Sequence, residues 1–147
     1  MTVALSGKDI AEKIEEKLPG SLEDSGKDYL LVKSESLPAV AEYLKNTESM
    51  DFDYFNYVTA VDYYSYFEVV YQLESVEHNH SIVLKTRCYD RDNPTVPTVS
   101  GLWQGANFQE REVYDLMGIK FEGHPNLKRM FLWDGFDGHP LRKDFIK

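Results

Sequence analysis

Cysteine is nearly absent from this chain of 147 residues, in which Cys88 is the only one. A single thiol cannot form an internal disulfide, complete a zinc site by itself or ligate an iron–sulfur cluster. Because Cys88 lies in a segment with strand-like alternation, we expect it to be a buried, small apolar side chain. The sequence thus excludes a disulfide-stabilised scaffold and a cysteine-based metal centre within the chain.

Long apolar runs are absent as well. No stretch approaches the roughly 18 consecutive apolar residues that a membrane-spanning helix needs. Residues 1–8 lack the basic start and the long apolar core of a signal peptide. We therefore expect a cytoplasmic chain that has no direct membrane span.

Positive charge is scarce, with 16 Lys and Arg against 25 Asp and Glu and a formal net charge of −9. Residues 1–119 hold 10 Lys and Arg against 21 Asp and Glu, whereas residues 120–147 hold 6 against 4. An acidic body repels phosphate backbones, so nucleic acid is not an expected partner. The mildly basic end suggests a tail that lies against another molecule.

The motifs of common catalytic sites are missing too. The chain has no Gly-x-Gly-x-x-Gly dinucleotide loop, no phosphate-binding P-loop, no Cys-x-x-Cys, no His-Glu-x-x-His and no Gly-x-Ser-x-Gly. Any chemistry would have to use histidines and carboxylates that no motif organises. We therefore predict no catalytic residue, no cofactor-binding residue and no metal ligand in this chain.

The chain does contain enough apolar material for one folded domain. Hydrophobic residues make up 42% of it and aromatic residues 14%, including ten tyrosines, which argues against disorder. The length suits a single domain. Tyrosine is enriched at protein interfaces, because its ring packs while its hydroxyl stays hydrated, so this composition is compatible with a surface that contacts other proteins.

Apolar residues recur at helical spacing in three segments. The first covers residues 6–18 and starts with a capping pattern, and the second starts at residue 36. The third is expected over residues 102–117, where Gly118 ends it. Its large apolar residues lie on several sides, which is typical of a helix that is covered from more than one direction.

Four segments are expected to form strands, at residues 28–33, 54–62, 66–75 and 80–89. The last two alternate between apolar and polar residues, as in a sheet with one well-buried face. Short turns connect the last three, which favours an antiparallel meander. The His78-x-His80 pair falls in a predicted hairpin loop, and we expect it to be exposed to solvent.

Beyond the third helix the periodicity ends, because glycines and prolines interrupt any helix or central strand. The large apolar side chains there each stabilise by roughly 1.5–3 kcal/mol when buried. We therefore expect one domain over residues 1–118 and an irregular C-terminal interaction tail over residues 119–147, laid along a partner. Arg129, Arg142 and Lys143 supply the tail's positive charge, either solvated or paired with a partner's carboxylates or backbone.

The densest group of charged residues lies in the predicted third helix. Glu110 shares one helical stripe with Val113 and Met117, which places a carboxylate among apolar groups. Arg111 and Asp115 are four residues apart and face each other on a helix. Two interpretations stay open: a surface ion pair worth less than about 1 kcal/mol, or a buried ion network that fixes the geometry of a contact between chains.

The motif Gly-His-Pro occurs twice, at residues 123–125 and 138–140. Each histidine stands between a flexible and a rigid residue, so a turn presents its imidazole. Four roles stay open: a structural histidine that donates to backbone carbonyls, a metal ligand, a general base or a pH switch. A metal would need further ligands, for which Glu122, Asp134 and Asp137 are the nearby choices.

The stretch from Glu110 to Arg129, with the close at residues 132–145, resembles the signature of the 30 kDa-type (NuoC-type) subunit of respiratory complex I, NADH:quinone oxidoreductase. That pattern reads Glu-Arg-Glu, Asp-Leu, Gly-Ile, Phe, Gly-His-Pro, Leu and Arg at set spacings, and it closes on Gly-His-Pro-Leu-Arg-Lys-Asp-Phe. The chain fills every one of these positions. Three upstream segments also resemble the family: residues 57–62, 67–71 and 94–99. The similarity covers roughly residues 29–145, with Phe108 standing where the family has Trp.

The resemblance implies an α+β fold, a two-layer α/β sandwich. Its order is helix, two strands, helix and three strands with a mixed sheet, followed by a helix and an extended C-terminal tail. The first strand of the pair would lie near residues 21–24, where the sequence pattern itself is weak.

The resemblance also implies a non-catalytic structural subunit in the peripheral arm of a proton-translocating complex, on the cytoplasmic face of the cell membrane. It would contact the quinone-site and iron–sulfur subunits, and FMN, the iron–sulfur clusters and quinone would lie on other subunits. The residues that the resemblance places at the interface are Glu110, Arg111, Glu112, Asp115, Gly118, Phe121, Gly123, His124, Pro125, Leu127, Arg129, Trp133, Phe136, Gly138, His139, Pro140, Leu141, Arg142, Lys143, Asp144 and Phe145.

Two other hypotheses stay open. The equivalent subunit of a membrane-bound hydrogenase or of another donor:quinone oxidoreductase would look the same, because the electron donor binds to other subunits. A freestanding enzyme that uses His124, His139 and nearby carboxylates with a metal is the remote alternative.

Overall fold

The computed structural model describes residues 3–4, 6–127 and 138–142. Its elements, in chain order, are β1 (Val3–Ala4), α1 (Gly7–Lys17), β2 (Leu22–Ser25), β3 (Tyr29–Val32), the 3-10 helix η1 (Ser34–Ser36), α2 (Leu37–Asn46), β4 (Tyr54–Asp62), β5 (Phe67–Ser75), β6 (His80–Cys88), β7 (Thr95–Pro97), α3 (Ala106–Met117) and β8 (Lys120–Glu122). This order confirms the predicted helix, strand pair, helix and three-strand arrangement.

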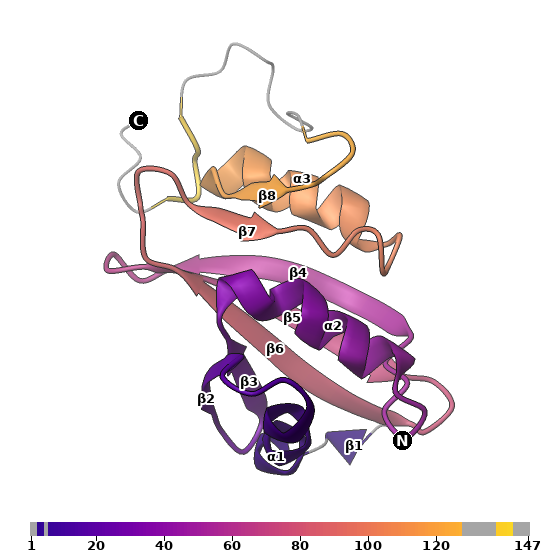
Figure 1. Ribbon diagram of the computed structural model, residues 1–147. Helices are drawn as coiled ribbons and strands as arrows, with labels where there is room; N and C mark the ends of the chain where they lie inside the picture. The colour runs from indigo at the N-terminus through magenta and orange to yellow at the C-terminus, as the bar shows by residue number, and fades with distance from the viewer. Residues whose placement is uncertain (1–2, 5, 128–137, 143–147) are drawn as a thin grey trace.

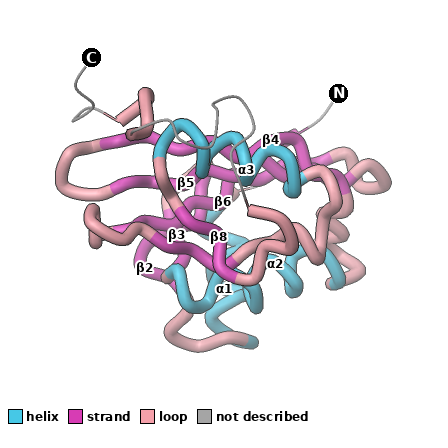
Figure 2. Tube along the Cα trace, turned by 90° about the horizontal axis from the view of Figure 1, so that it is seen from above, coloured by secondary structure: helices cyan, strands magenta, loops and turns pink. Residues whose placement is uncertain are grey.

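The main sheet is mixed, with strand order β2-β3-β6-β5-β4 and the short β1 paired in parallel with β6. Strands β4, β5 and β6 form the predicted antiparallel meander. Strand β3 lies parallel to β6, because the crossover through α2 and the meander returns the chain in the same direction. Helices α1 and α2 lie together against one face of this sheet (Figures 1 and 2). The fold is therefore the expected two-layer α+β sandwich.

The core lies between this sheet face and the helices. Alternate residues of β5 and β6 point into it, as their periodicity predicts. Helix α2 contributes the apolar side of its first two turns, with Leu37, Val40 and Leu44 fully buried. Cys88 is buried as predicted, and burial raises the pKa of its thiol to about 11.

The predicted exposure of the His78-x-His80 pair is correct for His78 and wrong for His80. His80 is the first residue of β6 and only 8% exposed, because it shares the inward-facing alternation of that strand. Its Nε2 lies 2.7 Å from the carbonyl oxygen of Met50, and its ring centroid lies 4.8 Å from that of Phe52. His80 is thus a core histidine with a backbone partner.

The C-terminal part of the domain departs from the expectation of an irregular tail that starts at residue 119. Strands β7 and β8 pair in parallel, with Val96 opposite Phe121, and both side chains are buried with Ile119. Residues 119–122 therefore belong to the fold of the domain. The predicted interface residues Arg129, Trp133, Phe136, Lys143, Asp144 and Phe145 lie outside the described residues.

Candidate functional site

Helix α3 is anchored along the edge strand β4 of the main sheet (Figure 1). The Val58 N–H donates to Oε1 of Gln109 at 2.9 Å, and Nε2 of Gln109 donates to the carbonyl of Asn56 at 3.2 Å. An edge strand otherwise presents unpaired backbone groups. The Gln109 amide therefore fixes the helix to the sheet through the edge that β5 leaves open.

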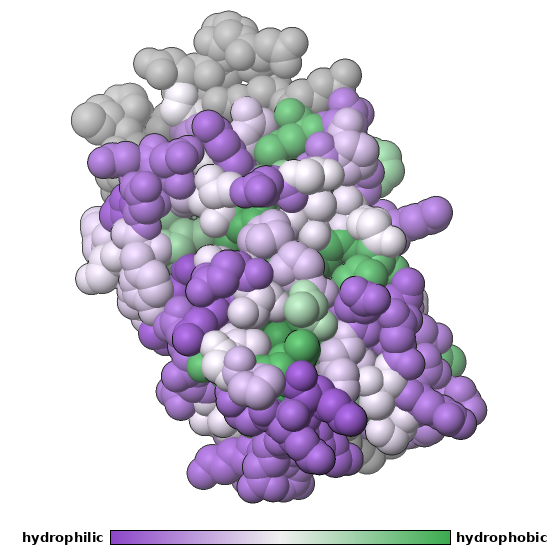
Figure 3. Space-filling model, in the orientation of Figure 1, coloured by the Kyte–Doolittle hydropathy of each residue, from purple (hydrophilic) through white to green (hydrophobic). Residues whose placement is uncertain are grey.

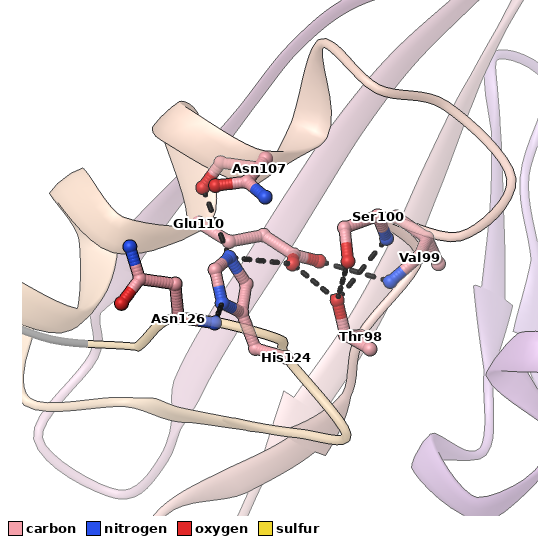
Figure 4. A network of polar contacts seen from close by, with 7 residues as sticks. All are labelled: Thr98, Val99, Ser100, Asn107, Glu110, His124 and Asn126. Carbon is pink, nitrogen blue, oxygen red and sulfur yellow. Dashed lines mark hydrogen bonds and ion pairs between the residues drawn. The ribbon is translucent and has the colours of Figure 1, made fainter.

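The Glu110 carboxylate is fully buried behind α3 (Figure 4). Its Oε2 accepts a hydrogen bond from the Val99 N–H at 3.0 Å, and its Oε1 accepts one from the Thr98 hydroxyl. Burial raises the pKa of the Glu110 carboxyl to about 7, although these two hydrogen bonds oppose the shift. Glu110 thus ties α3 to the segment that follows β7.

His124, from the first Gly-His-Pro motif, clamps the other side of this cluster (Figure 4). Its Nδ1 accepts from the Asn126 N–H at 2.9 Å, which assigns the ring proton to Nε2. Nε2 then donates to the carbonyl of Asn107 at 3.1 Å and lies 3.9 Å from Oε1 of Glu110. Both ring nitrogens are therefore engaged within the domain.

The second Gly-His-Pro motif closes the C-terminal end of α3. The last carbonyls of a helix have no partner within it, and three donors from residues 138–142 reach them here. The donors are His139 Nδ1 to Asp115 O at 2.9 Å, Leu141 N to Leu116 O at 2.9 Å and Arg142 Nε to Met117 O at 2.6 Å. Residues 138–142 thus act as a C-terminal cap that the chain itself supplies.

Gly118 makes this cap possible. Its φ of 76° is left-handed, and a Cβ at this position would lie 2.6 Å from Cδ2 of His139. Only glycine fits both the backbone conformation and the close approach. The glycine that ends α3 in the sequence is therefore also the seat of the second motif.

Of the four roles left open for the two imidazoles, the geometry favours the structural one. Each imidazole hydrogen-bonds to a main-chain carbonyl of α3. Within residues 6–127 and 138–142, three side chains that could share a metal ion come together only at Asp51, Glu77 and His78. Arg142, expected on a partner, instead lies over the Phe67 ring of its own domain at 4.9 Å. The prediction that the tail lies away from its own domain is wrong for residues 138–142.

The surface ion pair between Arg111 and Asp115, which was one of two interpretations, is not formed. Asp115 is fully buried, while the Arg111 guanidinium carbon lies 5.7 Å from the centroid of the Phe108 ring. The buried Nε of Arg111 has no hydrogen-bond partner among the described residues. Glu112 is exposed on the helix. The charged segment therefore separates into buried carboxylates and outward-facing groups.

A groove of about 990 Å³ lies beside these outward-facing groups. Phe108 and Arg111 of α3, Leu102 before it, Glu42 of α2 and Pro125 of the first Gly-His-Pro motif line it. Phe108 is 63% exposed, which is unusual for a large aromatic side chain. Sequence reasoning did not find this groove, because its walls come from four separate stretches of the chain.

A second buried ion pair was also missed. Arg91 bonds to Asp62 through both nitrogens of its guanidinium, at 2.6 and 3.0 Å, and Asp62 is almost fully buried. The two residues are 29 positions apart, in β4 and in the loop after β6. A bidentate arginine–carboxylate pair fixes orientation as well as distance, so it holds that loop against the end of β4.

Across the part of the chain that the structure describes, none of the helices is both long and apolar enough to cross a bilayer.

Comparison with known proteins identifies the family. The family model "Respiratory-chain NADH dehydrogenase, 30 Kd subunit" matches residues 30–147. A type-C subunit of the NADH-quinone oxidoreductase of Rhizobium meliloti (strain 1021), the second of its kind, is 41% identical over 78% of this chain, which spans 63% of that relative's length. The type-C subunit of the NADH-quinone oxidoreductase of Roseiflexus sp. (strain RS-1) is 39% identical, over 97% of this chain and 85% of the relative.

A solved structure has the same fold. It is that of the membrane-bound sulfane sulfur reductase, an archaeal respiratory membrane complex, and one of its chains superimposes with a TM-score of 0.77 at 28% identity. The match covers 95% of this chain and 85% of the other. These matches confirm the resemblance seen in the signature residues: the chain belongs to the family of the 30 kDa (NuoC-type) subunit of respiratory-chain NADH dehydrogenase, complex I.

Proposed function

We propose that this chain is a non-catalytic structural and assembly subunit in the peripheral arm of a proton-translocating NADH:quinone oxidoreductase. The observation that carries the proposal is how the signature residues are used. Glu110, His124 and His139 all bond inside the domain and hold α3 in place. The same helix turns Phe108 and Arg111 outward. The motif therefore builds a rigid helix whose outer side is available for a partner.

The partners in this proposal are the quinone-site and iron–sulfur subunits of the arm. The outer side of α3 and the tail after residue 127 would form the contact, on the cytoplasmic face of the membrane. FMN, the iron–sulfur clusters and quinone would be bound by those other subunits. This chain would then act on catalysis only through their positions, since electron transfer and quinone binding depend on where the subunits lie.

Proton-transfer chemistry by this chain is disfavoured by the contacts of its histidines. A general base needs a ring nitrogen that can reach a substrate proton. The Nδ1 lone pair of His124 is occupied by the Asn126 N–H, and its Nε2–H is donated to Asn107. The imidazole is fully buried besides. This arrangement supports a structural role over the remote hypothesis of a freestanding enzyme.

A second candidate function is the equivalent subunit of another membrane-bound respiratory complex. The fold match at 28% identity to a sulfane sulfur reductase complex supports this alternative. A membrane-bound hydrogenase or another donor:quinone oxidoreductase would need the same kind of subunit. The two candidates differ in the subunit that accepts electrons from the donor, which this chain does not contain.

Purification of the native complex through this chain tests both candidates. Membranes are solubilised in mild detergent, the chain is captured by an N-terminal tag, and the co-purifying subunits are identified by mass spectrometry. The proposal expects a flavin-bearing NADH-oxidising subunit together with quinone-site and iron–sulfur subunits. A hydrogenase or sulfur-reducing subunit in place of the NADH-oxidising one would establish the second candidate. A chain that purifies without any respiratory subunit would contradict both.

A further inference from the structure

The groove beside α3 combines an exposed ring with an incompletely bonded cation. Phe108 and Arg111 both face it from the helix, with the guanidinium over the ring at 5.7 Å. Arginine and large aromatic residues are the side chains most enriched at the centre of protein interfaces. The surface viewed in Figure 3 is mostly hydrophilic, and its apolar residues form separate patches. A partner that binds this chain therefore needs a polar contact as well as an apolar one.

The polar contact is indicated by Arg111 itself. Its Nε is buried and has no hydrogen-bond partner in the part of the chain that is described. Leaving a buried donor unbonded costs free energy, and more so for a charged group. An acceptor supplied from outside would remove that cost. The acceptor that matches a guanidinium in geometry and charge is a carboxylate.

We propose that this groove binds an aspartate or glutamate side chain of a partner polypeptide, whose carboxylate accepts a hydrogen bond from Arg111 while a neighbouring apolar side chain packs on Phe108. The proposal rests on the proposed function, since it names the chemistry of the partner at the outer side of α3.

The charges around the groove favour a carboxylate on a polypeptide over a small multivalent anion. Glu42 lines the groove opposite the helix, and the whole chain has a net charge of −9. This field disfavours a free phosphate, which would have two negative charges and no apolar part for Phe108. A side-chain carboxylate has one charge and arrives with apolar neighbours. The groove therefore suits an acidic residue that is flanked by apolar ones.

The test places a photo-reactive group in the groove of the full chain within the native complex. Gln104 lines the groove and is exposed, so it is replaced by p-benzoylphenylalanine, and membranes are irradiated before purification. Mass spectrometry then locates the cross-linked residue. We expect a cross-link to another subunit, at a position with an aspartate or glutamate within a few residues. A cross-link to residues 128–137 of this same chain would overturn the proposal, because the occupant would then be its own tail.

Arg111→Gln in the cross-linking chain tests the carboxylate contact. Loss of one partner of a buried charged pair weakens a contact strongly, so we expect the cross-link yield to fall by about tenfold or more. Lys120→Gln is the matched control, because it also removes one positive charge, from an exposed side chain of β8. Equal yields for the two variants would contradict the carboxylate contact. Exchange of charges, with Arg111→Glu here and arginine at the identified partner carboxylate, is expected to restore the cross-link.

The outcome separates this inference from the proposed function. A chain that co-purifies with the respiratory subunits but gives no cross-link from position 104 refutes the groove and leaves the structural role intact. A chain that co-purifies with none of them refutes the structural role itself. The melting temperature of the Arg111→Gln chain is measured alongside, and a value equal to that of the parent chain shows that a lost cross-link reflects the contact and not unfolding.

Discussion

The imidazole of His139 bonds through Nδ1 to the main-chain carbonyl of Asp115, at 2.9 Å, across 24 positions of sequence. Asp115 is in the last turn of α3, where carbonyls lack partners within the helix. The contact therefore makes the end of one helix depend on a short segment far along the chain. Loss of that segment's contacts should loosen the helix that carries the signature residues.

Substitution of His139 by alanine is expected to destabilise the chain by about 1–2 kcal/mol, because a carbonyl of α3 loses its donor. Denaturant unfolding monitored by circular dichroism measures the change. His78→Ala is the matched control, since His78 also contacts a backbone carbonyl but is exposed. An effect of His139→Ala no larger than that of the control would show that the cap contributes nothing to stability.

Substitution of Gly118 by alanine is expected to cost at least about 1 kcal/mol, because the left-handed backbone and the contact with His139 both exclude a Cβ. Gly101→Ala serves as control, since a Cβ there would contact nothing within 4 Å. The two variants are compared by thermal unfolding. If Gly118→Ala melts with Gly101→Ala, the close packing of residues 138–142 on this glycine is wrong.

The Glu110 carboxyl predicts a definite pH dependence of stability. Its pKa is raised from 4.5 to about 7 in the folded chain, so between these values the folded state binds more protons than the unfolded state. The favourable contribution is thus full below about pH 4.5 and is lost as the pH rises through about 7. The shift corresponds to a change on the order of 3 kcal/mol.

Glu110→Gln removes this titration and leaves the other groups in place. We expect the free energy of unfolding of the variant, relative to the parent chain, to increase between pH 5 and pH 8. Denaturant unfolding of both chains at several pH values measures the difference. Parallel curves for the two chains would mean that Glu110 does not titrate in this range.

Arg91→Ala is expected to destabilise the chain by about 2–4 kcal/mol, because it leaves the buried Asp62 carboxylate without its bidentate partner. The range lies below that of a fully buried pair, since the Arg91 side chain is partly exposed to solvent. Lys120→Ala, an exposed cation, provides the comparison. Chemical denaturation with m-values distinguishes loss of stability from loss of structure. Equal stabilities of the two variants would contradict a structural role for the pair.

The sheet and the first two helices could be predicted from periodicity, because their side chains alternate or recur against one continuous core. In β5, alternate residues from Phe67 to Leu73 are buried, and α2 buries one stripe that starts at Leu37. His80 shows the limit of the same reasoning. Its type suggests a polar loop, but its place in the alternation of β6 puts it in the core.

The candidate site was less predictable, because its contacts join residues that are distant in sequence. Thr98 and Glu110 are 12 residues apart, and three-residue strands such as β7 and β8 are too short to show a period. Position in the helix suggested that Arg111 pairs with Asp115, whereas tertiary contacts bury Asp115 and turn Arg111 to the groove. The signature pattern pointed to Glu110, His124 and His139, and the structure gives all three an intramolecular role.

The central claim is that this chain contributes structure and no redox chemistry, and the purified chain alone tests it most directly. Bound iron is measured by mass spectrometry, and NADH oxidation is followed by absorbance with a quinone analogue as acceptor. The account predicts iron at background level and no NADH turnover above buffer, with both recovered when the complete complex is assayed. Stoichiometric iron on the isolated chain, or turnover that His124→Ala abolishes, would contradict it.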